Sequence, residues 1–173
     1  ILNSTTSWNR ALHDGVFSSE NNSFSRKDNS INFSNSAKQI SSGDDNGFDL
    51  ILYCKTGMGD GQQANNPWLQ EFPDPITRVS WDNYLTVSKS DAEQLGLKNY
   101  NEANGALNSN YAIVNVGENE LKVPVVIQPG QAKGTVGLSL GYGRSKGLKN
   151  EMKTGVNAFS FYNGFSKNQK AQI

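Results

Sequence analysis

Cysteine and histidine are almost absent from this chain, which carries one of each, Cys54 and His13. One cysteine excludes an intrachain disulfide, and the two residues together cannot form a zinc site or an iron–sulfur cluster held by this chain alone. Cys54 ends the apolar run 48–54, so we expect a buried structural thiol. His13 lies beside Asp14 without any nucleophile motif, so we expect a structural histidine at a turn.

Net charge and long apolar runs are also missing. Sixteen basic and sixteen acidic residues cancel, which leaves no overall field to attract nucleic acid or anionic lipid. No apolar run approaches the roughly 18 residues of a membrane helix, so we expect no direct membrane insertion. Hydrophobic residues make up only 35% of the chain. The shortfall is concentrated in 18–46, a stretch rich in Ser, Asn, Asp and Gly, which we expect to be a long loop or poorly ordered insert.

The rest of the chain predicts a single domain, 1–173, built mainly from strands. We expect strands over 48–54, which we predict to be buried on both faces, and over 78–87. A hairpin follows over 111–116 and 120–127, with Leu121, Val123, Val125 and Ile127 on one face. Pro124 cannot donate to a ladder and indicates an edge or a bulge. We expect further strands over 135–140 and 154–162.

Helices are predicted at two places, and both end at glycine. Residues 8–17 predict a helical turn that ends at Asp14-Gly15. Ser88 or Ser90 begins a second helix, with Ser90 and Glu93 at capping-box spacing, and Gly96 ends it. Residues 99–110 predict a polar loop. The sequence as a whole indicates a mainly-β barrel or sandwich with short helices and long loops.

Several motifs together resemble a known family. They are SKSDAEQLGLK at 88–98, VPVVIQPGQAKGTVGLSLGYGR at 123–144 and GVNAF at 155–159. They resemble the C-terminal molybdopterin-dinucleotide-binding domain of molybdenum oxidoreductases, which folds as a double-psi β-barrel. The longer run GDGQQANNPWLQEFPDPITRVSWDNYL at 59–85 resembles the iron–sulfur/molybdopterin-like subunit of the bacterial alternative complex III. The resemblance covers 48–161 well and 8–17 weakly.

This resemblance implies a place in a membrane-bound, quinol-oxidising electron-transfer complex. The partners would be iron–sulfur, heme and quinol-binding subunits, on the periplasmic side of a bacterial inner membrane. The fragment would be cut from a larger subunit, which agrees with a start at Ile1 and no visible signal peptide. The family cofactor is molybdopterin guanine dinucleotide, and iron–sulfur clusters would lie elsewhere in the full subunit. We expect no cofactor and no catalysis in this fragment alone.

The resemblance also places candidate site residues. In molybdenum enzymes of this type, the loop after the first barrel strand and an asparagine near the last strand contact the cofactor. The corresponding positions here, as vestigial cofactor contacts, are Gly57, Gly59, Gly61, Gln62, Asn66 and Asn157. Small residues in such loops expose backbone N–H donors to pyrophosphate and pterin edges. Candidates for docking on a neighbouring subunit are Trp68, Phe72, Tyr142 and Arg144, although the first two could instead cover the core and the last two could form a simple barrel-end loop.

One departure from the family pattern bears on whether the cofactor is still bound. Cofactor-binding members commonly carry a Gly-Arg pair in the first loop, whereas this chain has Gly57-Met58-Gly59-Asp60-Gly61. Asp60 beside a pyrophosphate would be repulsive. We therefore expect a scaffold that has lost its cofactor. The alternatives are a genuine molybdopterin guanine dinucleotide-binding domain of a molybdenum oxidoreductase and a secreted ligand-binding β module.

Overall fold

The computed structural model describes residues 8–15, 33–41, 46–163 and 168–173. The chain divides into two compact units, 1–43 and 44–173. The first contains α1 (Trp8–Asp14) and α2 (Phe33–Ser41). As predicted, α1 ends at Gly15, which has a φ of 65°. The helix α2 lies inside the stretch 18–46, where we expected no regular structure; Ala37, Lys38 and Gln39 are residues that favour a helix.

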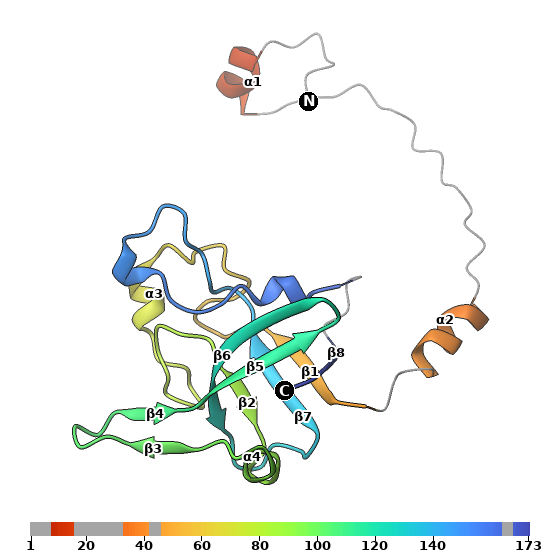
Figure 1. Cartoon of the computed structure of the whole chain (residues 1–173). Coiled ribbons are helices and arrows are strands. Elements are labelled where there is room, and N and C mark those ends of the chain that lie inside the picture. Colours follow the sequence, from red (N-terminus) through yellow and green to blue (C-terminus); the bar gives the residue numbers. More distant parts are fainter. Residues whose placement is uncertain (1–7, 16–32, 42–45, 164–167) are drawn as a thin grey trace. The chain divides into compact units, whose positions relative to one another are not determined.

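The second unit is built on one six-stranded mixed sheet in the order β5-β6-β2-β7-β1-β8. Its strands are β1 (Phe48–Tyr53), β2 (Leu85–Val87), β5 (Tyr111–Val116), β6 (Asn119–Ile127), β7 (Thr135–Ser139) and β8 (Asn168–Ala171). The sheet is curled (Figure 1), and Asn115 of the edge strand β5 forms an isolated bridge with Gln172, the residue after the other edge strand, β8. The chain is therefore mainly β, as the sequence predicted.

The pattern of strand pairing stays the same when β1 is exchanged with β6, β2 with β7 and β5 with β8. β1 runs parallel to β7, and β2 runs parallel to β6. β1 is antiparallel to β8, and β5 is antiparallel to β6. The antiparallel β2–β7 pair and the β5–β8 bridge map onto themselves. The sheet thus consists of two similar three-stranded halves, interlocked because each parallel pair joins a strand of one half to a strand of the other.

The core lies inside the curl of the sheet and is made of apolar side chains from alternate strand positions. Its fully buried members include Leu50, Leu85, Val114, Val125, Leu138 and Phe161. On β6, Leu121, Val123, Val125 and Ile127 all belong to this core or pack against it. This confirms the predicted apolar face of that strand.

The prediction that 48–54 is buried on both faces is wrong. Leu50 and Leu52 are buried, but Ile51 between them is 45% exposed. In the described part of the chain, no second layer buries Ile51 on the outer face of the sheet, so only one side of β1 is in the core. Cys54, which follows β1, is exposed rather than buried. Its thiol is therefore open to solvent.

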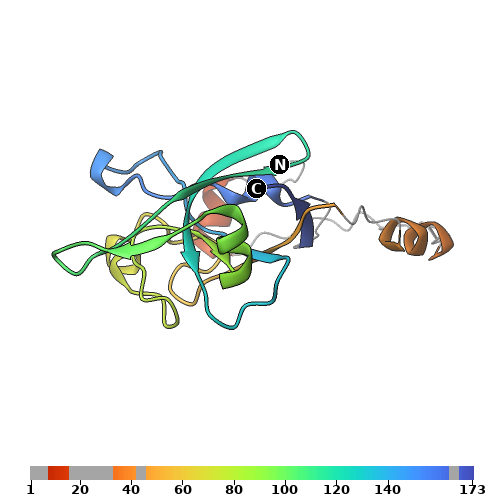
Figure 2. The ribbon, with the colours of Figure 1, turned by 60° about the horizontal axis from the view of Figure 1, so that its bottom comes forward.

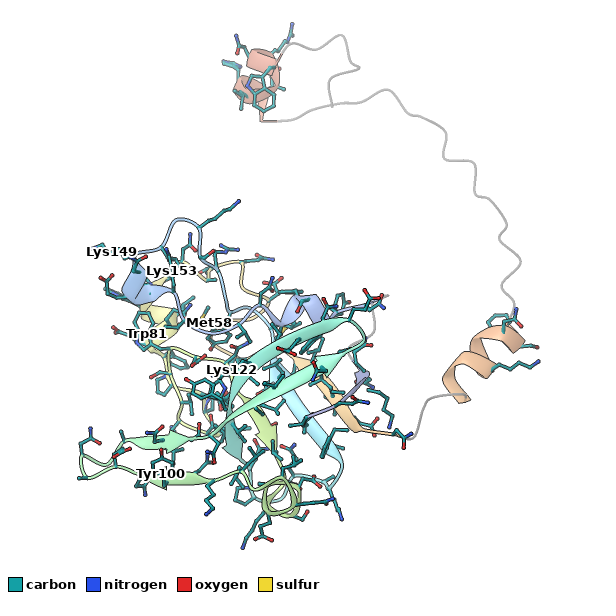
Figure 3. The ribbon with its side chains drawn as sticks, viewed as in Figure 1. Met58, Trp81, Tyr100, Lys122, Lys149 and Lys153 are labelled. Carbon is teal, nitrogen blue, oxygen red and sulfur yellow. The ribbon has the colours of Figure 1, made fainter. Side chains whose placement is uncertain are left out.

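The predicted strand 78–87 is much shorter in the structure, where β2 spans only Leu85–Val87. Arg78 and Trp81, at φ values of 62° and 68°, lie in the left-handed region. Such residues turn the chain sharply and interrupt an extended run. Residues 78–84 are therefore a turning segment, and Trp81 and Met58 both lie in the group of loops above the sheet (Figure 3).

The helix α4 (Lys89–Leu95) confirms the predicted helix after residue 88 and its stop at Gly96, which has a φ of 70°. The N-cap is Ser88, whose hydroxyl accepts a hydrogen bond from the Asp91 N–H at 3.1 Å and donates to the Asp91 carboxylate at 2.6 Å. Asp91 also accepts from the Gly134 N–H at 2.8 Å. The capping interaction thus ties the turn before β7 to the start of α4, and it uses Ser88 and Asp91 instead of Ser90 and Glu93.

The predicted hairpin of β5 and β6 is confirmed, with a turn at 117–118. Pro124, however, lies within β6, which is an interior strand. It faces Tyr111 and precedes the first residue of β6 that pairs with β2, Val125. Its missing N–H points toward β2 one residue before that ladder begins, so no ladder bond is lost.

Two predictions for the remaining segments are wrong. The polar loop 99–110 contains a projecting hairpin, β3 (Asn99–Asn101) and β4 (Leu107–Ser109), which carries Tyr100 (Figures 1 and 3). Segment 154–162 contains the 3-10 helix η2 (Ala158–Phe161) instead of a strand. A further 3-10 helix, η1 (Asn150–Met152), precedes it, and a short helix, α3 (Pro67–Glu71), follows β1.

Candidate functional site

The candidate site lies where the parallel strands β1 and β7 end. Because these strands run in the same direction, their carboxyl ends meet at one end of the sheet. Two loops leave from this end, which is opposite to α4 (Figures 1 and 2). They are 54–66, which we name the first loop, and 140–147, which we name the second loop. Together with the start of η2 they surround a cavity of about 460 Å³, which we name the loop cavity.

Glycines allow the two loops to touch through their backbones. A Cβ at Gly61 would lie 2.7 Å from the Cα of Gly141, and a Cβ at Gly141 would lie 2.9 Å from the Gly61 nitrogen. Both residues have φ values near the left-handed region, 92° and 93°. In the second loop, a Cβ at Gly143 would lie 2.3 Å from the nitrogen of Asn157. The wall of the loop cavity therefore depends on direct backbone contact at these positions.

The loop cavity is lined by charges of both signs. Arg144 and Lys146 line it from the second loop, and Asp60 lines it from the first. Within the described residues, neither cation forms an ion pair. The Asp60 carboxylate accepts hydrogen bonds from the Gln62 backbone N–H at 3.1 Å and from the Gln62 side-chain amide at 3.2 Å. Its orientation is thus fixed by its own loop.

Several N–H groups of the first loop form hydrogen bonds within the loop itself. Gly59 donates to the Lys55 carbonyl at 2.8 Å, and Gly61 donates to the Met58 carbonyl at 2.9 Å. The next turn continues the pattern, since Ala64 donates to the Gly61 carbonyl at 3.0 Å. With the Gln62 N–H bonded to Asp60, the loop offers a carboxylate where a pyrophosphate site needs donors. The Asp60 carboxylate and the bonded N–H groups disfavour a nucleotide pyrophosphate at the first loop.

The structure divides the predicted cofactor contacts among three places. Gly61 and Asn157 line the loop cavity. Gly57, Gly59 and Gln62 line a second hollow of about 440 Å³, which shares Asp60 with the loop cavity. Asn66 lines neither, because its side chain caps α3 by accepting from the Trp68 N–H at 3.0 Å.

The predicted docking residues also separate into two pairs. Trp68 is 82% exposed on α3, and Phe72 at the end of this helix is exposed as well. Phe72 packs with one edge on Gly57, where a Cβ would lie 3.3 Å from the ring. Tyr142 and Arg144 instead line the loop cavity, and Tyr142 is buried.

Sequence reasoning missed Asn83, which holds the far wall of the site. Its side-chain amide nitrogen donates to the Ser139 carbonyl at 2.9 Å and to the Val156 carbonyl at 3.0 Å. Its side-chain oxygen accepts from the Val156 N–H at 2.9 Å. Asn83 is fully buried, and it thereby joins the end of β7 to the residue before Asn157. No local pattern in the sequence indicates this role.

Sequence reasoning also missed Lys55, which lies buried beneath the loops and is 6% exposed. Its ammonium group donates to the Asp82 backbone carbonyl at 3.0 Å and lies 3.9 Å from the centre of the Tyr84 ring and 5.0 Å from that of Tyr142. Burial lowers the pKa of Lys55 to about 8, against the opposing effect of the nearby carboxylates Asp74 and Asp82. Burial likewise raises the pKa of Tyr84 and of Tyr142 to about 12.

This arrangement predicts a pH-dependent stability. Between pH 8 and 10, Lys55 loses its proton in the folded protein but keeps it in the unfolded chain, where its pKa is 10.5. The unfolded state then binds more protons at this residue, so Lys55 should add about 2 kcal/mol to the free energy of unfolding over this window. Urea unfolding followed by tryptophan fluorescence at several pH values measures this rise.

The matched variant for this measurement is Lys55→Met, which keeps an unbranched side chain of nearly the same length and removes the charge. Its free energy of unfolding should show no rise over the same window. Toward pH 10 and above, both proteins should lose stability, because burial raises the pKa of Tyr53, Tyr84 and Tyr142 and these groups therefore ionise first in the unfolded chain. An equal rise in the variant would show that Lys55 is not the titrating group.

Across the described ranges, no group of three or more histidine, cysteine, aspartate or glutamate side chains is placed to hold a metal ion. In the same part of the chain, no helix has the length and apolar character needed to cross a membrane. No protein-family model matches the chain. A search of curated proteins finds no match either.

Proposed function

We propose that this chain is the double-psi β-barrel domain of a molybdopterin oxidoreductase-type subunit, most similar in role to that of alternative complex III. In this proposal the domain is a scaffold without cofactor, in a membrane-bound complex that oxidises quinol on the periplasmic side of a bacterial inner membrane. Its neighbours would be iron–sulfur, heme and quinol-binding subunits. The domain itself performs no chemistry.

The strand order supports the fold in this proposal. A double-psi barrel has two interlocked three-stranded halves, and the exchange of β1, β2 and β5 for β6, β7 and β8 reproduces every pairing of the curled sheet. Such an arrangement requires two parallel pairs that each cross between the halves. The motifs that resemble the family lie in the loops around α3, in α4, along β6 and β7, and in η2.

The proposed loss of the cofactor is supported mainly by the hydrogen bonds that the first loop forms within itself. The N–H groups of Gly59, Gly61, Gln62 and Ala64 are all bonded within that loop. Asp60 adds a negative charge at the shared wall of the two hollows. A pyrophosphate there would gain no hydrogen bond from these four N–H groups and would meet a carboxylate. Trp68, 82% exposed beside this loop, suits a role in packing against a neighbour.

Metal and nucleotide analysis of the purified full subunit tests this proposal. We expect molybdenum and acid-extractable guanine nucleotide well below one per chain. Heme and iron–sulfur absorbance should copurify with the subunit from solubilised membranes. Stoichiometric molybdenum would contradict the scaffold and favour a working molybdenum enzyme, whereas the absence of both molybdenum and copurifying heme would contradict membership of the complex.

One observation favours the second candidate, a genuine dinucleotide-binding domain. Arg144 and Lys146 line the loop cavity without an ion pair among the described residues, and they could attract a phosphate that the first loop cannot hold. Calorimetric titration with guanosine diphosphate separates the candidates. The scaffold predicts no saturable binding; binding that disappears in the double variant Arg144→Gln, Lys146→Gln would instead establish the second candidate.

A further inference from the structure

A cavity of about 300 Å³ lies on the outer face of the sheet, and we name it the outer cavity. Its lining includes Ile51 of β1, Gly137 of β7 and Thr86 of β2. The strand registers pair Gly137 with both Ile51 and Thr86, so the three residues lie side by side across the sheet. They alternate along their strands with core residues such as Leu50 and Leu138, and they therefore form the floor of a cavity that faces away from the core.

Gly137 lets side chains of both neighbouring strands approach the backbone of β7. A Cβ at this position would lie 2.7 Å from the Thr86 hydroxyl oxygen and 3.2 Å from the Tyr53 ring. The Tyr53 ring thus lies close to β7 and forms part of the lining. Ile51 and Ile76, which also line the outer cavity, are 45% and 77% exposed. The outer cavity therefore offers apolar surface to the body of a small molecule.

One wall of the outer cavity is the turn 74–77, which is held in place by hydrogen bonds. The Asp74 carboxylate accepts from the Ile76 N–H at 3.0 Å and from the Thr77 N–H at 2.9 Å. The Thr77 hydroxyl donates to the same carboxylate oxygen at 3.2 Å and is also hydrogen-bonded to the Tyr84 hydroxyl. This wall is thus formed without a ligand, as is usual for small-molecule sites.

The polar groups left over in the outer cavity can all accept a hydrogen bond. Gln131 uses its side-chain N–H groups on the carbonyls of Thr86, at 3.0 Å, and Thr135, at 2.6 Å, which leaves its side-chain oxygen as an acceptor. The second carboxylate oxygen of Asp74 has no partner among the described residues. Within the same ranges the Tyr53 hydroxyl forms no hydrogen bond. Three acceptors match the three N–H donors of an ammonium group.

The charge of the outer cavity is negative. No lysine or arginine belongs to its lining, and Asp74 forms no ion pair with a described residue. Against the effect of burial, hydrogen bonds from the N–H groups of Thr77 and Ile76 lower the pKa of Asp74, so its carboxylate is ionised at neutral pH. Lys55 also lowers this pKa, but its ammonium donates to the Asp82 carbonyl. The outer cavity therefore favours a cation.

We propose that the outer cavity binds a small organic ammonium ion, which is a primary amine on an apolar body. The ammonium group lies at Asp74 and donates to Tyr53 and Gln131, and the apolar body covers Ile51 and Ile76. The cavity volume is at the lower end for ligand pockets and limits the ligand to about ten non-hydrogen atoms. This site lies outside the loop cavity and uses none of its residues, so it does not rest on the proposed function.

Benzylamine is the probe for the outer cavity, because it joins a primary ammonium to an apolar ring. Its matched control is benzyl alcohol, which has nearly the same size and no charge. In titrations at neutral pH followed by amide NMR, benzylamine should shift the N–H signals of Ile51, Thr77 and Gly137 in a saturable manner. We expect benzyl alcohol to bind about tenfold more weakly.

Three variants separate the charge from the apolar contact. Asp74→Asn keeps an oxygen for the N–H groups of the turn 74–77 and removes the charge, so benzylamine affinity should fall about tenfold, to that of benzyl alcohol. Glu118→Gln makes the same change in net charge at the exposed β5–β6 turn and should bind benzylamine within about twofold of the parent. Ile51→Ser should weaken both probes by a similar factor, about threefold, and leave their ratio unchanged.

Four results would overturn the proposal. They are no saturable binding of benzylamine, equal affinity for benzylamine and benzyl alcohol, an equal loss in Glu118→Gln and Asp74→Asn, and tighter binding of Nα-acetyl-lysine N-methylamide than of benzylamine. The last would assign the outer cavity to a lysine side chain of a protein partner. We expect this lysine derivative to bind more weakly, because its amide groups enlarge it beyond the cavity. If Asp74→Asn does not fold, the ratio of the two probes in the parent protein still decides the question.

Discussion

Replacing Gly143 by alanine should lower the free energy of unfolding by about 3 kcal/mol or more. Gly143 has a φ of 78°, and a Cβ there would lie 2.3 Å from the Asn157 nitrogen and 2.5 Å from the Val156 carbonyl carbon. An alanine must therefore adopt a left-handed conformation and also displace backbone, which no rotation of a side chain can relieve. Urea unfolding monitored by tryptophan fluorescence measures the loss.

Gly147→Ala is the matched control for this prediction. Gly147 lies in the same loop at nearly the same φ, 77°, but a Cβ there would meet only the Asn65 side chain, at 3.5 Å. It tests the left-handed conformation without the collision, and we expect a loss of about 1 kcal/mol. Equal losses in the two variants would show that the contact between Gly143 and Asn157 does not hold the loop cavity together.

The parts of the fold that were predictable from sequence depend on neighbours along the chain. The helix after residue 88 follows from a capping serine and a stop at Gly96, all within nine residues. The β5–β6 hairpin follows from two alternating runs around a short turn. In both, the residues that specify the structure are also the residues that form it.

The parts that were not predictable depend on distant residues. The outer face of β1 is partly open, since Ile51 is 45% exposed among the described residues, and an apolar run cannot reveal whether a second layer exists. Segment 78–84 has the composition of a strand, yet Arg78 and Trp81 turn it, and the Trp81 N–H donates to the Gln70 carbonyl at 2.7 Å. Tertiary contacts of this kind override local β propensity.

The candidate site shows the same division. The glycines of the first loop could be recognised as a turn-forming segment, and Asp60 could be recognised as unfavourable for a phosphate. The parallel pairing of β1 with β7 brings loops about 80 residues apart to one end of the sheet. Only this pairing places Arg144 and Lys146 in one cavity with Asp60, and the sequence alone does not reveal it. The hydrogen bonds within the first loop could not be predicted either, because a glycine-rich sequence does not specify which N–H groups remain free.

Replacing Asn83 by alanine should cost about 4 kcal/mol of unfolding free energy. The change removes the three hydrogen bonds of a buried amide, at 2.9, 3.0 and 2.9 Å, and leaves the Ser139 carbonyl and the Val156 N–H without these partners, while the Val156 carbonyl still accepts from the Ala158 N–H at 3.1 Å. Each unsatisfied buried group costs about 1–3 kcal/mol. Urea unfolding gives the magnitude. The location follows from amide exchange, where the Val156 N–H should lose its protection while that of Val114 in β5 keeps it.

Asn108→Ala is the control, because Asn108 is an exposed amide on β4 whose side-chain nitrogen donates to Glu102 at 3.0 Å. We expect this change to alter stability by less than about 0.5 kcal/mol. If Asn83→Ala changed the free energy of unfolding as little as Asn108→Ala does, other contacts, such as that of Gly155 with Tyr142, would have to hold Val156 against the end of β7. A large loss confined to Val156 and its neighbours would instead establish that one buried amide, contributed by the turning segment before β2, holds Asn157 at the wall of the loop cavity.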